Sequence, residues 1–366
     1  MIKKAAVFCL VLFVGVAIFG CAKVADTSTT PVATTQVKLS ASNIIVSGNQ
    51  LTCSLAALNQ NNAVVTGMGT SNFSGAIYQT NPTITAAGAK AQATIVATLE
   101  FTAINSASKS IDAALVLDKS GSMGWDDGTL TKVTSEEIAA KAFIDEEYNV
   151  STSNKAAIVF LDSTTWVEKA MTAVSDKAAF YTAIDKAHLS GGSTALYDGM
   201  AKGVLEASKE AAATNLVRAV VALTDGGENA SVTYNTSKEV ADLAIASSVP
   251  IYTVGLFNTT AEAVSLRKAL QDIAIATTGS VDNYFEIIVG VTALSVNAQE
   301  VSARKIRAMG ALIDLYKSLA VALTQSYTLT ATLSTTLSPG TYWMKITLQN
   351  YGSFTGQTVT VSFVVS

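Results

Sequence analysis

The pattern of apolar and polar positions divides the chain into three regions. Residues 37–108 hold short apolar runs with partial alternation, separated by Asn, Gly, Ser and Pro, which is typical of strands and turns. Residues 326–366 show the same pattern, with Ser338-Pro339-Gly340 as a turn. Neither end alone has enough strands for a β-sandwich, and small isolated sheets are poorly stable. We therefore expect one all-β sandwich built from both ends, with two separate small β domains as the alternative.

The middle of the chain, residues 109–325, has a different pattern. Strand-like apolar runs alternate there with helical periodicity, and runs such as Val217–Leu223 are, apart from Arg218, apolar on both faces. Strands of that kind are buried between two layers of helices. The alternation predicts an α/β domain with a doubly wound, mostly parallel sheet, inserted into or flanked by the β-sandwich.

The first residues have the features of a targeting segment. Lys3 and Lys4 precede an apolar run, residues 5–20, that is shorter than the roughly 20 residues of a membrane-spanning helix. The run ends at Cys21 and resembles a bacterial lipoprotein signal. We expect a signal peptide over 1–20, lipid on Cys21 and a flexible tether over 21–36. The alternative is an ordinary signal peptide in which Cys21 is incidental.

Composition narrows the classes of function. The 366 residues carry a net charge of −4, so no basic surface suggests nucleic acid as a partner. The single histidine, His188, follows a predicted helix, and the chain has no Ser–His–Asp order, zinc pair or phosphate-binding loop. We therefore expect no enzymatic activity.

Three segments of the middle region carry oxygen ligands. They are LVLDKSGSMG at 115–124, GGSTALYDGM at 191–200 and LTDGGEN at 223–229. Ligands of doubly wound sheets bind outside the carboxyl ends of the strands, where these segments are expected to meet. Few charges and hard oxygen donors suit Mg²⁺ or Mn²⁺. Helix capping and turn formation explain any one segment, but hardly all three. The candidate ligands are Asp118, Ser120, Ser122, Thr194 and Asp225.

These segments resemble the metal-ion-dependent adhesion site of the von Willebrand factor A domain. The resemblance covers about 111–325 and implies that Ser120, Ser122 and Thr194 ligate the ion directly. It implies that Asp118 and Asp225 act directly or through water, and that an Asp or Glu of a partner protein completes the coordination. In integrin β subunits a similar acidic pair binds a second cation, which suggests a Ca²⁺ site at Asp126 and Asp127. A polar turn is the alternative there, since the spacing is one residue longer.

These observations lead to one expected function and two alternatives. We expect a lipid-anchored protein of the bacterial cell envelope, facing the periplasm or the cell surface, that binds a protein partner for adhesion through a divalent metal. Its only membrane contact is the lipid. One alternative is a periplasmic assembly or regulatory component that recruits a subunit by the same site. An envelope hydrolase is the less favoured alternative because no catalytic set is present.

Overall fold

The residues that the computed structural model describes are 36–59, 64–82, 94–105, 109–124, 131–186, 191–289, 298–352 and 356–365. All of them belong to one compact unit.

The middle of the chain forms a six-stranded sheet in the order β10-β9-β8-β5-β6-β7. Every pair in it is parallel except β6–β7, which is antiparallel. The prediction of an α/β domain with a mostly parallel sheet is therefore confirmed. Its strands are β5 (Ser110–Asp118), β6 (Lys155–Leu161), β7 (Thr165–Ala173), β8 (Leu216–Thr224), β9 (Ile251–Phe257) and β10 (Tyr284–Ile288).

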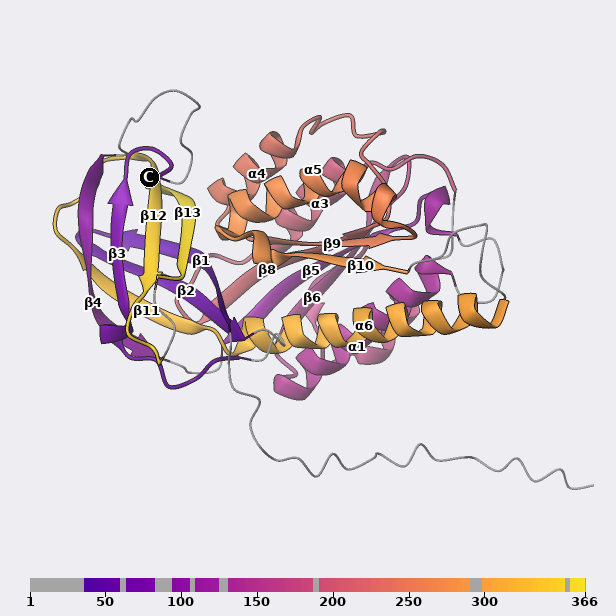
Figure 1. The fold of residues 1–366 in the computed structure, drawn as a ribbon, viewed down its shortest axis with the longest axis horizontal. Coiled ribbons are helices and arrows are strands. Elements are labelled where there is room, and N and C mark those ends of the chain that lie inside the picture. Colours follow the sequence, from indigo (N-terminus) through magenta and orange to yellow (C-terminus); the bar gives the residue numbers. More distant parts are fainter. Residues whose placement is uncertain are drawn as a thin grey trace, which may run out of the picture. The chain divides into compact units, whose positions relative to one another are not determined.

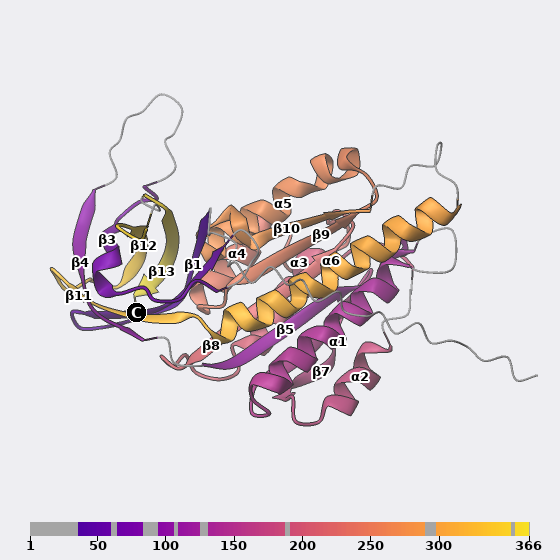
Figure 2. The same ribbon diagram turned by 60° about the horizontal axis from the view of Figure 1, so that its bottom comes forward.

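Helices cover both faces of this sheet (Figure 1). One face packs against α1 (Lys132–Val150), α2 (Lys177–Ile184) and α6 (Ala298–Thr324). The other face packs against α3 (Leu196–Ala207), α4 (Ser237–Ala246) and α5 (Thr260–Thr278). Figure 2 shows α6 lying along α1. The central strand β5 is buried over almost its whole length, as its apolar sequence predicts.

Both ends of the chain contribute to a second sheet. Its seven strands lie in the order β1-β2-β11-β4-β3-β12-β13, and each neighbouring pair is antiparallel. One apolar core lies against this sheet, and its two edge strands, β1 and β13, contact each other. The strands are β1 (Val37–Ser47), β2 (Gln50–Asn59), β3 (Phe73–Tyr78), β4 (Ile95–Asn105), β11 (Tyr327–Leu333), β12 (Gly340–Leu348) and β13 (Thr358–Val365).

The chain enters and leaves the α/β domain at neighbouring points. The backbone N–H of Lys109 donates to the carbonyl of Thr324 at 3.1 Å. The buried Lys109 Nζ donates to Ser54 Oγ at 2.8 Å and to the carbonyl of Tyr327 at 3.1 Å. Burial lowers the pKa of Lys109 to about 8. Through these two hydrogen bonds, the Lys109 side chain connects the point where the chain enters the α/β domain to β2 and β11 of the seven-stranded sheet.

The structure differs from the sequence-based expectations in three places. The β region is one continuous antiparallel sheet, so the predicted two-sheet sandwich is supported only in part. One of the short apolar runs that predicted strands within residues 37–108 lies at 63–69, and its described part contributes only the bridge between Leu58 and Val64. The edge strand β7 was not predicted, because its half-buried sequence shows no clear hydrophobic period.

No helix among the described residues is long and apolar enough to cross a membrane.

Candidate metal centre

The predicted ligands lie at the carboxyl ends of adjacent strands. Asp118 is the last residue of β5, and Ser120 leads into the short 3₁₀ helix η2 (Gly121–Met123). Asp225 directly follows β8, the strand next to β5. Thr194 lies two residues before α3. Parallel strands bring these sequence-distant segments to one edge of the sheet.

Hydrogen bonds connect four of the five predicted ligands. Ser122 Oγ donates to Asp225 Oδ1 at 2.6 Å and lies 3.2 Å from Ser120 Oγ. The backbone N–H of Ser120 donates to Asp118 Oδ1 at 2.8 Å. Asp118, Ser120 and Asp225 are all at most 1% exposed. The two carboxylates and two hydroxyls therefore form one continuous group, in which Asp118, Ser120 and Asp225 are buried and Ser122 is exposed to solvent.

Asp118 is held by partners on two further elements. Thr224 Oγ1, at the end of β8, donates to Asp118 Oδ2 at 2.6 Å. The backbone N–H of Asp118 donates to Oε1 of Glu136, which belongs to α1, at 2.9 Å. Burial raises the pKa of Asp118 to about 6, opposed by the hydrogen bonds from Ser120 and Thr224 and increased by the charge of Asp225. Burial also raises the pKa of Glu136 well above its usual value, with the Asp118 charge acting in the same direction.

The glycine loop before α3 connects to the other two segments. Gly192 has φ 87°, and the backbone N–H of Gly121 donates to its carbonyl at 3.3 Å. A Cβ at Gly192 would lie 2.5 Å from Ser163 Oγ, so a side chain does not fit there. Thr194 N–H donates to Asn229 Oδ1 at 2.7 Å, and Asn229 N–H donates to the Thr194 carbonyl at 3.0 Å. These contacts fasten the Thr194 segment to the loop after β8.

The space between the three segments suits a small cation. A Cβ built on Gly226 would lie 3.2 Å from Thr194 Oγ1 and 3.3 Å from Ser122 Oγ, so the missing side chain leaves room beside both hydroxyls. Among the described residues, no group of three or more His, Cys, Asp or Glu side chains is arranged to hold a metal. The donor set here instead has two carboxylates and three hydroxyls, which fits a hard ion such as Mg²⁺ or Mn²⁺.

Three residues at this site were not predicted from the sequence. Lys132, Glu136 and Thr224 are each 0% exposed and contact the predicted ligands or their backbone. Of these three residues, only Thr224 could have been found from the sequence. It is the last residue of a buried strand that ends at the same edge of the sheet as Asp118. Asp126, Asp127 and His188 lie outside the described residues, as do Cys21 and the stretches before residue 36 that were predicted to be a signal peptide and a tether.

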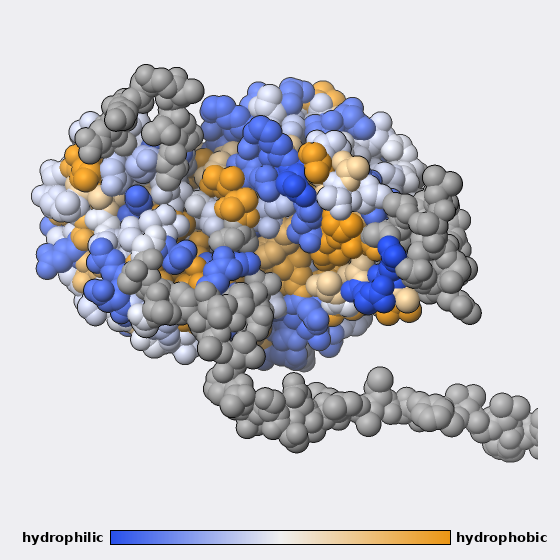
Figure 3. All heavy atoms as spheres, viewed as in Figure 1, coloured by the Kyte–Doolittle hydropathy of each residue, from blue (hydrophilic) through white to orange (hydrophobic). Residues whose placement is uncertain are grey.

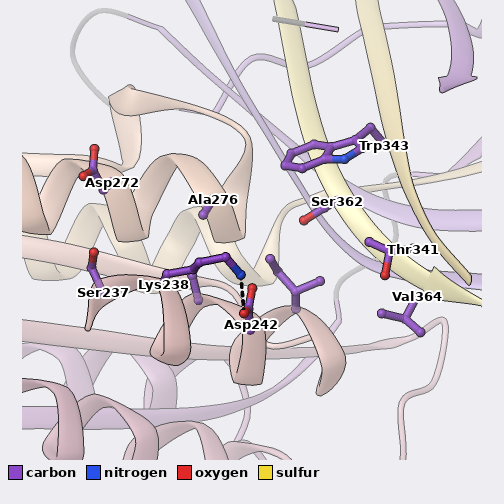
Figure 4. A pocket seen from close by; sticks show the side chains of 11 residues that line it. Ser237, Lys238, Asp242, Asp272, Ala276, Thr341, Trp343, Ser362 and Val364 are labelled. Carbon is purple, nitrogen blue, oxygen red and sulfur yellow. Dashed lines mark hydrogen bonds and ion pairs between the residues drawn. The ribbon is translucent and has the colours of Figure 1, made fainter. Parts of the chain in front are cut away.

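Two of the hollows on the described surface lie away from this site. One, of about 620 Å³, is lined by α4, α5, β12 and β13 and includes Trp343, Asp242 and Asp272 (Figure 4). The other is lined by β10 and α6 and includes Ile287, Ile288 and two arginines. Figure 3 shows apolar side chains gathered among hydrophilic ones on the face that it displays. None of the five predicted ligands lines either hollow.

Comparison with known proteins identifies the α/β part. Residues 112–288 match the family model described as the von Willebrand factor type A domain, so this part of the chain is such a domain. The resemblance inferred from the three ligand segments is thus confirmed. No curated protein is similar enough to count as a relative of this chain.

Several solved structures are distantly similar. Proximal thread matrix protein 1 from the mussel byssus, with a zinc-occupied MIDAS motif, is 18% identical over 62% of this chain and 48% of its own, with a TM-score of 0.42. A von Willebrand factor type A protein from Catenulispora acidiphila is 11% identical over 90% of this chain and 73% of its own, with a TM-score of 0.41. The vWF domain of the type V pili tip protein Mfa5 from Porphyromonas gingivalis is 10% identical over 59% of this chain and 97% of its own, with a TM-score of 0.41. This chain spans about half the length of the mussel protein.

Proposed function

We propose that this chain is a lipid-anchored protein of the bacterial cell envelope that binds a protein partner through a divalent cation. The cation is Mg²⁺ or Mn²⁺, held by Asp118, Ser120, Ser122, Thr194 and Asp225. The partner supplies a carboxylate of Asp or Glu, and the chain acts in adhesion or protein recognition rather than in catalysis.

The observation that carries this proposal is the convergence of three loops on one set of oxygen atoms. Ser122 connects Asp225 to Ser120 by side-chain contacts of 2.6 and 3.2 Å, and the Thr194 hydroxyl borders the same space beside Gly226. Capping accounts poorly for this set, since Ser120 at the start of η2 makes no side-chain capping hydrogen bond and the N-cap residue of α3 is Ala195 rather than Thr194. The polar atoms are therefore available for a shared ligand.

Charge explains why an acidic partner fits the ion. The five ligands bring two formal negative charges to a divalent cation, and the hydroxyls are neutral. The cation keeps much of its electrophilic character, so an incoming carboxylate gains a strong contact. Because both carboxylates of the site are buried, the charges there are screened less than charges on an exposed surface.

Affinity capture from a cell-envelope extract tests the proposal. The chain without residues 1–20 is immobilised, and proteins retained with Mg²⁺ are compared with those retained with a chelator. We expect a partner retained with Mg²⁺ and lost with the chelator and with Asp118→Ala. Gly310→Ala is the matched control, because a Cβ at that helical position meets no atom within 4 Å. A partner retained equally in all four samples would place binding elsewhere on the protein.

A further inference from the structure

A buried lysine lies against the predicted metal ligands. Lys132 is the first residue of α1, and its side chain is 0% exposed. Its Nζ forms an ion pair with Oδ2 of Asp225, whose side chain is also 0% exposed, and donates to the carbonyl oxygen of Ser122 at 3.2 Å. The ammonium group thus contacts residues of two of the three ligand segments, Ser122 and Asp225, directly.

This position is unfavourable for a lysine unless the ion pair compensates for it. An ammonium removed from water loses a large hydration energy, which only close pairing restores. The N-terminus of a helix also carries partial positive charge, which repels a cation in the first turn. Thr131 already caps α1 by accepting a hydrogen bond from the N–H of Thr134 at 3.0 Å. Lys132 is therefore not needed for capping, and its burial is explained by the carboxylate of Asp225.

Counting charges shows the consequence for a metal ion. Ionised Asp118 and Asp225 carry two negative charges, and Lys132 neutralises one of them. A divalent ion at the same carboxylates therefore meets a net charge of −1 rather than −2, with a fixed positive charge close by. Repulsion between like charges in a buried site is strong, because the surroundings screen it weakly.

We propose that Lys132 is an internal cation of the site, which holds the carboxylate of Asp225 in the metal-free protein and competes with the divalent ion for it. This inference rests on the metal site proposed above. In the metal-free state, Lys132 turns Oδ2 of Asp225 toward α1 and leaves Oδ1 bonded to Ser122, so the ligands stay ordered. With the ion bound and Lys132 still near, the site carries one excess positive charge. An acidic partner residue neutralises that charge, so Lys132 makes the site selective for an acidic ligand.

The test is Lys132→Met, which keeps the aliphatic stem and removes the charge. Calorimetric titration with Mg²⁺ and with Mn²⁺ should show affinity increased by about tenfold or more, because the repulsion is gone. In chelator the variant should melt at a lower temperature than wild type, because Asp225 is left buried without a counter-ion. Saturating Mn²⁺ should restore the melting temperature toward the wild-type value.

Lys141→Met is the matched control. Lys141 lies on the same helix and pairs with Asp185, but both side chains are partly exposed. We expect this variant to leave metal affinity unchanged and to lose little stability, as exposed ion pairs contribute little. Lys132→Gln, which retains hydrogen-bond donors without the charge, is the second variant in case Lys132→Met does not fold in chelator. It should also bind the ions more tightly than wild type.

The outcomes separate this inference from the proposed function. If wild type binds Mn²⁺ and both Lys132 variants bind it equally or more weakly, Lys132 is only a structural partner of Asp225 and the inference is wrong. If only the variants bind, Lys132 blocks the site in the metal-free protein, which supports the inference in its strongest form. If neither wild type nor any variant binds Mg²⁺ or Mn²⁺, the metal site itself is wrong, and the inference ends with it.

Discussion

The hydroxyl of Thr224 donates a 2.6 Å hydrogen bond to Oδ2 of Asp118 and joins the carboxyl ends of β8 and β5. The same hydroxyl oxygen accepts a hydrogen bond from the N–H of Gly226 at 3.0 Å. The Thr224 side chain thus orients both the buried carboxylate of Asp118 and the turn that follows Asp225. The relative position of two candidate ligands, Asp118 and Asp225, depends on it.

Thr224→Val tests this role. The substitution keeps the shape of the side chain and removes the hydroxyl, so Asp118 loses a donor and its pKa rises further. We expect Mg²⁺ affinity to fall about tenfold, the usual size of one hydrogen bond to a charged group. Calorimetric titration at pH 7.5 measures it. Thr224→Ser retains the hydroxyl and should bind Mg²⁺ nearly as well as wild type, and equal loss in both variants would contradict the role of the hydrogen bond.

Gly226→Ala tests the space beside the hydroxyls. The added methyl would lie 3.2 Å from Thr194 Oγ1 and 3.3 Å from Ser122 Oγ, where an ion or its water must fit. We expect at least a tenfold loss of Mn²⁺ affinity with a melting temperature in chelator within a few degrees of wild type, because the loop lies outside the core. Gly310→Ala is the control. Unchanged Mn²⁺ binding by Gly226→Ala would place the ion elsewhere.

Glu147→Gln tests a pH dependence of stability. Glu147 is a buried residue of α1 whose Oε2 accepts a hydrogen bond from Asn154 at 2.7 Å, while Oε1 has no partner among the described residues. Burial raises its pKa from the ordinary value of 4.5 to about 8. Between about pH 4.5 and pH 8, Glu147 therefore keeps its proton in the folded protein and releases it in the unfolded chain. The stabilising contribution of Glu147 is complete below about pH 4.5 and is lost as pH rises through about 8.

Thermal unfolding at several pH values measures this effect. We expect the wild type to lose melting temperature between pH 5 and pH 9 more steeply than Glu147→Gln, which cannot ionise. The two proteins should be most alike near pH 5. Glu137→Gln, a partly exposed position of the same helix, should follow the wild-type curve. Parallel curves for wild type and Glu147→Gln would show that Glu147 does not hold the proton.

Cys21→Ser tests the proposed anchor. A single cysteine would carry the whole acyl anchor, so its loss should move the protein from the membrane fraction to the soluble fraction. Cys53→Ser is the control, because Cys53 is buried in the seven-stranded sheet and should not affect anchoring. Fractionation and mass spectrometry of the N-terminus decide the matter. A wild-type chain that begins at an unmodified Cys21 would rule lipid attachment out.

Much of the α/β domain was predictable because its signals are local. The strands β5, β6, β8 and β9 are mostly apolar, and parallel strands place their carboxyl ends at one edge. The motifs around Asp118, Thr194 and Asp225 could therefore be assigned to one site without the structure. Strands β7 and β10 were missed, because edge strands are half buried and lack a clear hydrophobic period.

The amino-acid sequence indicates which residues can offer oxygen atoms and which edge of the sheet presents them. What surrounds those atoms depends on how the helices pack on the sheet. Lys132 and Glu136 are four residues apart on α1, a spacing that normally indicates an exposed ion pair. Both are buried instead, and each reaches a different strand end: Lys132 contacts Asp225, 93 residues away, and Glu136 contacts the backbone of Asp118. A helix pattern cannot indicate such partners, because they depend on how α1 packs across the sheet.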